Sequence, residues 1–298
     1  MSFSAEVKNE LCNAKRGCSF CTGAELYGML LFGDAVSQDS LTFVTECREA
    51  ADLFVMDTIE LTGAIMTIHE PDLRDRTHRP LYTVTLEDMG GILRIIQQFH
   101  PFDEELHMNL LPKTCCKNAF LRGAYLACGT MSNPSKEYHL EFRAPNLRLA
   151  SILCGILEQS GLHFKISLRG GDPVVYVKES EAIEDTLARL GAPNQSMELM
   201  NRKIEKEVRN NANRITNCET ANIEKTVNAS LAQILKIKKI KDSVGLESLP
   251  IPLQEAALLR LANPDATLSQ LCMLAGGSVS RSGLNHRLNR LCKLADEL

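Results

Sequence analysis

The sequence predicts an α+β fold in which a pseudo-symmetric, duplicated domain is followed by an all-α helix-turn-helix domain. Three observations support this prediction. The same order of helices and strands occurs twice between residues 15 and 195, the net charge changes sign along the chain, and residues 246–298 contain the start and stop signals of three short helices. A chain of 298 residues is long enough for two or three domains with their own cores.

The duplication is clearest in two helical segments that each carry a glycine near the middle. Residues 24–33 (AELYGMLLFG) match residues 119–129 (AFLRGAYLACG), and Gly28 corresponds to Gly123 at an offset of 95 residues. A glycine inside a helix costs about 1 kcal/mol relative to alanine. Because it occurs at matching positions in both copies, we expect the two helices to approach each other closely at a pseudo-two-fold axis.

Each copy then continues with the same elements. In the first copy we expect strands at 41–45, 64–68 and 81–85 and helices at 48–61 and 89–98; in the second, strands at 138–142, 163–168 and 174–178 and helices at 147–159 and 181–190. Such a unit leaves one sheet face and one helix face bare, and pairing two copies covers both. The duplicated domain is therefore expected over 15–195, with copies at about 15–100 and 112–195, after a helical arm at 1–14.

The paired segments resemble the two LAGLIDADG helices of homing endonucleases. Residues 26–34 and 121–129 keep the glycine at the third position of that nine-letter pattern. In the nucleases, the acidic residue at the eighth position of each motif holds the divalent metal ions that cut DNA, because hard cations need carboxylate oxygens.

The eighth positions of this chain carry no carboxylate. They are Gly33 and Cys128, and Asp34 lies one residue later with Gly129 as its counterpart. The resemblance therefore implies a homing-endonuclease-like domain with degenerate LAGLIDADG positions (Gly28, Gly33, Asp34, Gly123 and Cys128) and no catalytic residues. A residual metal-dependent endonuclease acting through Asp34 is the alternative.

The C-terminal residues 246–298 contain residues that mark the starts and ends of helices. Thr267 with Gln270 three positions later is a capping box, Gly276 and Gly277 form a turn, and Ser280 can cap a further helix. The expected helices are 253–262, 268–275 and 281 to about 294. Two helices joined by a short glycine-containing turn, with a supporting helix before them, are typical of the helix-turn-helix.

The last of these helices has one apolar and one polar face. Projected at about 100° per residue, Leu284, Leu288, Leu291 and Ala295 fall together, and no acidic residue precedes Asp296 on the other side. The residues expected at the DNA are Thr267, Ser280, Arg281, Ser282, Asn285, His286, Arg287, Asn289, Arg290 and Lys293. The competing interpretation is an ordinary amphipathic helix of a three-helix packing domain.

Within this set we assign two roles. Arg281, Ser282, Asn285 and His286 are assigned to base edges, because the N-terminal part of the second helix enters the major groove, where arginine pairs with guanine and asparagine with adenine. Arg287, Arg290 and Lys293 are assigned to phosphates.

Charge is divided unevenly along the chain. Residues 1–110 carry 8 basic and 18 acidic residues, a net of −10, whereas residues 111–298 carry 25 and 19, a net of +6. Residues 200–241 hold 10 basic and 4 acidic residues, so a polyanion is attracted there. Protein docking is at least as well supported as DNA contact for the acidic first copy.

The segment 196–245 is predicted to be a basic helical connector with more than one helix. Apolar spacing predicts a buried stripe and hence a packed connector (Ile223, Val227, Leu231, Ile234 and Ile237). Hydrogen bonding to the duplicated domain and contact with DNA are both open for the amide-rich part, and we favour the structural role (Asn210, Asn211, Asn213, Arg214, Asn217 and Asn222).

Four segments together resemble the WhiA family of sporulation and cell-division regulators: residues 120–133 (FLRGAYLACGTMSN), 138–141 (YHLE), 210–222 (NNANRITNCETAN) and 280–288 (SRSGLNHRL). The resemblance implies a transcription regulator that binds double-stranded DNA and acts in cell division, chromosome segregation and, where it occurs, sporulation. It also implies another transcription regulator or RNA polymerase as a partner, which no residue pattern identifies. A non-specific nucleoid-associated scaffold is a further alternative.

A cytoplasmic protein with no membrane partner is expected, because no apolar stretch approaches the roughly 20 residues of a membrane span and residues 1–10 lack the pattern of a secretory signal. Nucleoid association is expected from the DNA binding that the resemblance implies. The odd count of 11 cysteines argues against a disulfide framework. The C-x-x-C formed by Cys18 and Cys21 corresponds to Cys115 and Cys116 in the second copy, so a tetrahedral zinc site is conceivable. Adjacent cysteines are awkward joint ligands and buried free thiols are common. We therefore expect no metal or other cofactor.

Overall fold

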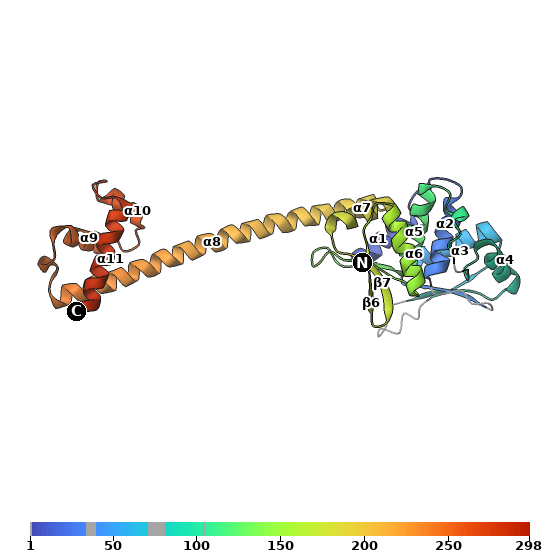
Figure 1. Ribbon diagram of the computed structural model, residues 1–298, viewed down its shortest axis with the longest axis horizontal. Coiled ribbons are helices and arrows are strands. Elements are labelled where there is room, and N and C mark those ends of the chain that lie inside the picture. Colours follow the sequence, from blue (N-terminus) through green and yellow to red (C-terminus); the bar gives the residue numbers. More distant parts are fainter. Residues whose placement is uncertain (1, 34–39, 71–80, 104) are drawn as a thin grey trace. The chain divides into compact units, whose positions relative to one another are not determined.

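The computed structural model describes residues 2–33, 40–70, 81–103 and 105–298. They form two compact units, Met1–Lys206 and Glu207–Leu298. A single helix of 51 residues, α8 (Pro193–Ser243), crosses the boundary between the units (Figure 1). The boundary lies within the segment 196–245, where the sequence predicts more than one helix and the structure has one.

The first copy of the repeat contains the predicted order of elements. These are α2 (Cys21–Phe32), β1 (Leu41–Thr45), α3 (Arg48–Thr62), β2 (Thr67–His69), β3 (Tyr82–Leu86) and α4 (Met89–Phe99). The three strands form an antiparallel sheet in the order β1-β3-β2. Leu41 lies opposite Leu86 and Phe43 opposite Val84, and all four side chains are buried, so one sheet face belongs to the core.

The second copy repeats this order with one additional strand. Its elements are α5 (Thr114–Cys128), β4 (Gly129–Met131), β5 (Leu140–Arg143), α6 (Leu147–Gln159), β6 (Lys165–Arg169), β7 (Asp172–Val177) and α7 (Ser180–Leu190), after the short helix η1 (Met108–Leu110). The sheet order is β4-β5-β7-β6. Sequence analysis misses β4 because its three residues follow α5 directly and are too few to show an alternating pattern.

Helices α2 and α5 form the centre of the first unit, and their glycines are in contact. Every residue of α2 except Gly23 is buried. A Cβ at Gly28 would lie 2.2 Å from the carbonyl oxygen of Phe120, and a Cβ at Gly123 would lie 2.0 Å from that of Glu25. The expectation of close approach is therefore confirmed, because neither position has room for any side chain.

A buried ionic network joins the same two helices. The Glu25 carboxylate accepts from Nε and Nη2 of Arg122 at 2.6 and 2.7 Å and from Nε of Arg16 at 3.1 Å. Arg16 also donates to Asp57. Burial raises the pKa of Asp57 to about 6, although its pairing with Arg16 acts against the shift. The network couples the two copies, because loss of one partner leaves an unpaired charge in the interior.

The N-terminal residues form α1 (Phe3–Cys12), which belongs to the core of the first unit. Phe3, Val7 and Leu11 are buried in it. The carboxylate of Glu10 accepts hydrogen bonds of 2.9 Å from the backbone N–H groups of Asn194 and Gln195 and so satisfies two free donors in the first turn of α8. The described residues of the segment 1–14 are therefore packed against the unit rather than extended from it as an arm.

The second unit has its own core. It combines the end of α8 with η2 (Leu246–Ser248), α9 (Ile251–Ala262), α10 (Leu268–Leu274) and α11 (Arg281–Glu297). Ile237, Ile240, Leu271 and Leu288 are buried together there. The buried Arg260 guanidinium donates to Gln233 Oε1 at 3.0 Å and to the carbonyl oxygen of Ala266 at 2.6 Å, which ties α9 to α8 and to the loop before α10.

The prediction of a packed connector is wrong for most of its apolar stripe. Ile223, Val227 and Leu231 are 64%, 48% and 53% exposed, Ile234 is half-buried, and Ile237 is buried. The spacing of these residues is helical, but a stripe is buried only where another element covers it.

The structural role expected for the amides of the connector also fails. All six residues of the set are exposed (Asn210, Asn211, Asn213, Arg214, Asn217 and Asn222). The Asn222 side chain donates only to Cys218 Sγ within the same helix, at 3.7 Å. A repeated amide therefore does not by itself indicate a buried hydrogen-bond network.

The helix contact predicts a selective effect of added methyl groups. Gly123→Ala should lower the free energy of unfolding of the first unit by about 3 kcal/mol, because the new Cβ overlaps backbone that cannot move away. Gly155→Ala in α6 is the matched control, since nothing lies within 4 Å of its Cβ position, and it should gain up to about 1 kcal/mol. Chemical denaturation of both variants tests this, and equal stabilities would contradict a tight α2–α5 contact.

Candidate nucleic-acid interface

Local signals fix the start of α11. The side chain of Ser280 accepts a 3.1 Å hydrogen bond from the Gly283 N–H, as predicted for a cap. Gly276 and Gly277 have φ of 66° and 70°, a left-handed conformation that favours glycine. Together they turn the chain sharply between α10 and α11, as a helix-turn-helix requires.

The buried face of α11 determines which side chains point to solvent. Leu284, Leu288, Leu291 and Ala295 are all buried in the core of the second unit, as the periodicity predicts. Seven of the expected DNA-contacting residues are consequently exposed: Arg281, Ser282, Asn285, His286, Asn289, Arg290 and Lys293.

The other three expected residues have partners within the protein. Thr267 accepts from the Gln270 N–H and donates to Gln270 Oε1, so its hydroxyl serves the capping box. Ser280 caps α11. Arg287 is partly covered, and its Nη1 lies 3.8 Å from Glu255 Oε2. Thr267 and Ser280 therefore cap the starts of α10 and α11. Arg287 is partly exposed to solvent and partly in contact with Glu255 of α9.

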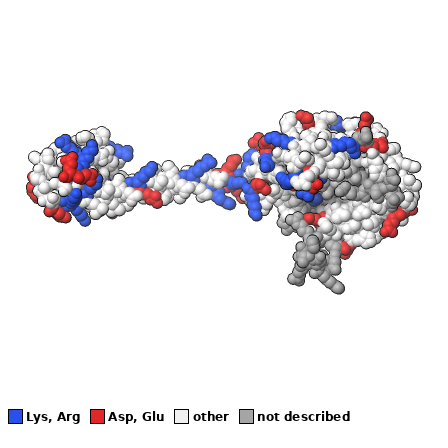
Figure 2. Space-filling model, turned by 60° about the horizontal axis from the view of Figure 1, so that its bottom comes forward, with Lys and Arg blue, Asp and Glu red and all other residues white. Residues whose placement is uncertain are grey.

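One lysine of α8 adjoins this face and a second contacts the end of α11, although sequence analysis only counts both in the basic run. Lys236 lines a surface hollow with His286, Asn289 and Arg290 of α11. Its ammonium lies 2.7 Å from Asp296, and that hydrogen bond raises its pKa. Lys239 donates to the carbonyl oxygen of Ala295 at 2.8 Å. In Figure 2, Lys and Arg side chains lie along α8 and on the second unit, where acidic side chains lie among them.

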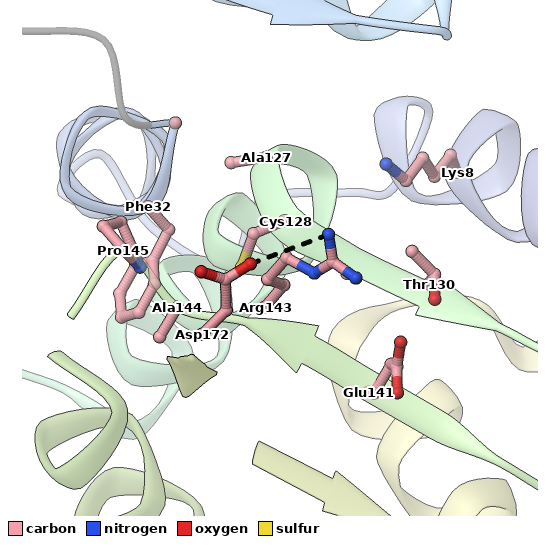
Figure 3. Close-up of a pocket in the computed structure, with 12 residues that line it drawn as sticks. Lys8, Phe32, Ala127, Cys128, Thr130, Glu141, Arg143, Ala144, Pro145 and Asp172 are labelled. Atoms are coloured by element: carbon pink, nitrogen blue, oxygen red, sulfur yellow. Dashed lines mark ion pairs between the residues drawn. The ribbon is translucent and has the colours of Figure 1, made fainter. Parts of the chain in front are cut away.

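The eighth LAGLIDADG positions meet at one open pocket of the first unit. Gly33 and Cys128, at the C-terminal ends of α2 and α5, both line it, together with Lys8 of α1 (Figure 3). A Cβ at Gly33 would lie 3.0 Å from Cδ2 of Phe43 and 2.7 Å from the Met29 carbonyl oxygen. An aspartate would not fit there without movement of its neighbours. Asp34 lies outside the described residues.

The chemistry of this pocket differs from that of a metal site. Burial raises the pKa of Cys128 to about 12, so its thiol is protonated at neutral pH. Burial also lowers the pKa of Lys8, whose Nζ donates to the Leu126 carbonyl oxygen at 3.2 Å. A protonated thiol and a lysine amine do not provide the anionic oxygens that Mg²⁺ prefers.

The two described carboxylates that line the pocket have cationic neighbours. Asp172 lies 3.9 Å from Nη1 of Arg143, the ion pair marked in Figure 3. Glu141 contacts His139 Nε2 at 2.7 Å and Arg169 Nη1 at 2.9 Å. Both residues belong to β-strands of the second copy, so the symmetric pair of carboxylates that would hold metal ions between two helix ends is missing from the described residues.

The structure also brings the four paired cysteines together. The sulfur atoms of Cys18, Cys21, Cys115 and Cys116 all lie within 4.8 Å of one another, at the N-terminal ends of α2 and α5. The cluster and the pocket therefore occupy opposite ends of the same helix pair.

Comparison with known families agrees with this organisation. Residues 117–209 match the model of the WhiA LAGLIDADG-like domain, and residues 212–295 match that of the WhiA C-terminal HTH domain. The chain thus belongs to the class of proteins that combine a LAGLIDADG-like α+β domain with a C-terminal helix-turn-helix.

Full-length relatives place it more closely. It is 37% identical to a probable cell division protein WhiA of Ruminiclostridium cellulolyticum, in an alignment that covers 100% of this chain and 98% of the relative. It is also 37% identical to a probable cell division protein WhiA of Desulforamulus reducens, over 100% of this chain and 96% of the relative. The chain belongs to the WhiA family. The crystal structure of full-length DUF199/WhiA from Thermatoga maritima has the same fold, with a TM-score of 0.61 and 23% identity over 100% of this chain and 99% of that one.

None of the helices in the described residues has both the length and the apolar character to cross a membrane.

The cap of α11 can be tested without DNA. Ser280→Ala should speed amide hydrogen exchange in the first turn of α11 about fivefold, because a lost N-cap costs about 1 kcal/mol. Ser269→Ala, an exposed position in the first turn of α10, is the control and should leave exchange unchanged. Unaltered protection in the Ser280 variant would show that the hydroxyl does not hold this helix start.

Proposed function

We propose that the chain is a sequence-specific DNA-binding transcription regulator of cell division and chromosome segregation and, where the organism sporulates, of sporulation. The observation that carries the proposal is the solvent-facing side of α11, which is polar and basic from Arg281 to Lys293 and has no acidic residue in that stretch. The helix is held by caps at its start and by buried leucines behind it, so this face is presented in a fixed orientation.

Two contact roles follow from position along α11. Arg281, Ser282, Asn285 and His286 lie in its first turns, where a recognition helix reaches base edges in the major groove. Arg290 and Lys293 lie further along and are assigned to phosphates, where they set the register of the protein on the duplex. Arg287 contributes after exchanging its contact with Glu255 for a phosphate oxygen.

In this proposal the first unit keeps the fold of a nuclease but has no nuclease activity. The geometry that supports this is the pocket at Gly33 and Cys128, where a glycine and a protonated thiol stand at the positions that carry metal-binding carboxylates in the nucleases. The acidic residues 1–110, with a net charge of −10, fit docking of a protein partner such as another regulator or RNA polymerase better than contact with DNA.

The two roles on α11 predict different phenotypes. Arg281→Ala should weaken binding to the selected site by about 5- to 150-fold and relax the base preference at one position. Lys293→Ala should weaken binding to selected and random DNA about equally and reduce the slope of log K against log salt by about 1. Binding titrations of the full-length variants across salt measure both, and non-selective losses in the two variants would refute the division of roles.

Absence of cleavage is tested on plasmid DNA. The full-length protein with Mg²⁺ or Mn²⁺ should leave the plasmid intact under conditions in which it binds the DNA, because Gly33 and Cys128 provide no carboxylates at the two helix ends for two-metal chemistry. Site-specific cutting that disappears in an Asp34→Asn variant would establish the endonuclease alternative instead. Equal affinity for random and selected DNA would favour the other alternative, a nucleoid-associated scaffold that binds DNA without sequence specificity.

A further inference from the structure

The four cysteines at the N-terminal ends of α2 and α5 have the geometry of a metal site. Cys18 Sγ lies 3.6 Å from the sulfur atoms of Cys21, Cys115 and Cys116, and all four sulfurs lie within 4.8 Å of one another. A tetrahedral zinc ion with Zn–S bonds of about 2.3 Å separates its sulfur ligands by about 3.8 Å. The observed spacing is thus close to that of four thiolates around one ion.

Two segments distant in sequence build this cluster. Cys18 and Cys21 are joined by a turn in which the Cys21 N–H donates to the Cys18 carbonyl oxygen at 3.1 Å, and Cys21 begins α2. Cys115 and Cys116 stand in the first turn of α5. Gly17 permits the approach, because a Cβ there would lie 2.9 Å from Cys115 Cβ.

The sequence-based objection to adjacent ligands does not hold in this geometry. Side chains of successive helical residues diverge by about 100°, yet the sulfurs of Cys115 and Cys116 lie within 4.8 Å of each other. Cys18 Sγ lies 3.6 Å from each of them. Both neighbours can therefore bind one ion with Cys18 and Cys21 completing the tetrahedron.

The helix ends at the cluster favour thiolates. The cluster lies at the positive, N-terminal ends of two helices of 12 and 15 residues. This partial positive charge acts against the formal −2 of a zinc ion with four thiolates.

We propose that Cys18, Cys21, Cys115 and Cys116 bind one Zn²⁺ ion as a structural Cys₄ site that links the two copies of the repeat. Four protein ligands leave no open position for water, so the ion is structural and not catalytic. It closes a loop between residues 97 apart in sequence and fixes the helix pair at the end opposite the pocket of Gly33 and Cys128.

The metal content of the full-length protein tests this proposal directly. Protein purified under reducing conditions in the presence of zinc, without a metal-binding tag, should contain one zinc per chain by elemental analysis. Cys18→Ser and Cys115→Ser should each lose it, whereas Cys218→Ser, at an exposed cysteine of α8, should retain it. Retention of zinc in the Cys18 and Cys115 variants, or a zinc-free wild-type chain, would overturn the proposal.

A second measurement uses the wild-type protein and does not depend on the variants folding. Bound zinc should protect the four thiols from alkylation, and a strong chelator should expose them and lower the Tm by about 10 °C. Cys218 should react equally in both states and provides the internal control. Replacing zinc with Co²⁺ should give the absorption bands of tetrahedral thiolate coordination. Identical labelling with and without chelator, or a Cys18–Cys21 disulfide that forms while zinc is present, would refute the site.

Discussion

The close contact of α2 and α5 at Gly28 and Gly123 is the constraint on which the first unit depends. Each glycine Cβ position overlaps the backbone of the other helix, at 2.2 and 2.0 Å from a carbonyl oxygen, so the distance between the helices is fixed by backbone rather than by deformable side chains. This contact places Glu25 against Arg122 and brings both ends of the two helices together. The ion network, the cysteine cluster and the pocket all follow from it.

The two ends of this helix pair have different chemistry. At the C-terminal ends, Gly33 and the protonated Cys128 replace the carboxylates of a nuclease, and Lys8 adds an amine. At the N-terminal ends, four sulfurs are close enough for one metal ion. A hard cation needs oxygen ligands and zinc accepts thiolates, so the residues favour a structural ion at one end and no catalytic ion at the other.

Prediction from sequence was most accurate where the signals are local. The helix α6 and the strand β1 occur at the predicted residues, and the capping box of Thr267 and the cap of Ser280 are confirmed. Features that need a partner element were missed or mistaken. The strand β4 depends on pairing with β5, and Ile223 has helical spacing without anything to cover it. Lys236 joins the face of α11 only because α8 supplies part of the second core.

The sequence by itself determined the duplication, the absence of carboxylates at Gly33 and Cys128 and the polar face of α11. Residue identity and helical periodicity are local properties of the chain, and a repeat is found by comparing the chain with itself, so none of the three requires a folded contact. Tertiary structure alone decided that Cys18 lies 3.6 Å from Cys115 and that Arg122 neutralises Glu25. Each of these pairs is 97 residues apart, so the contact exists only once two helices have packed at a set distance and register.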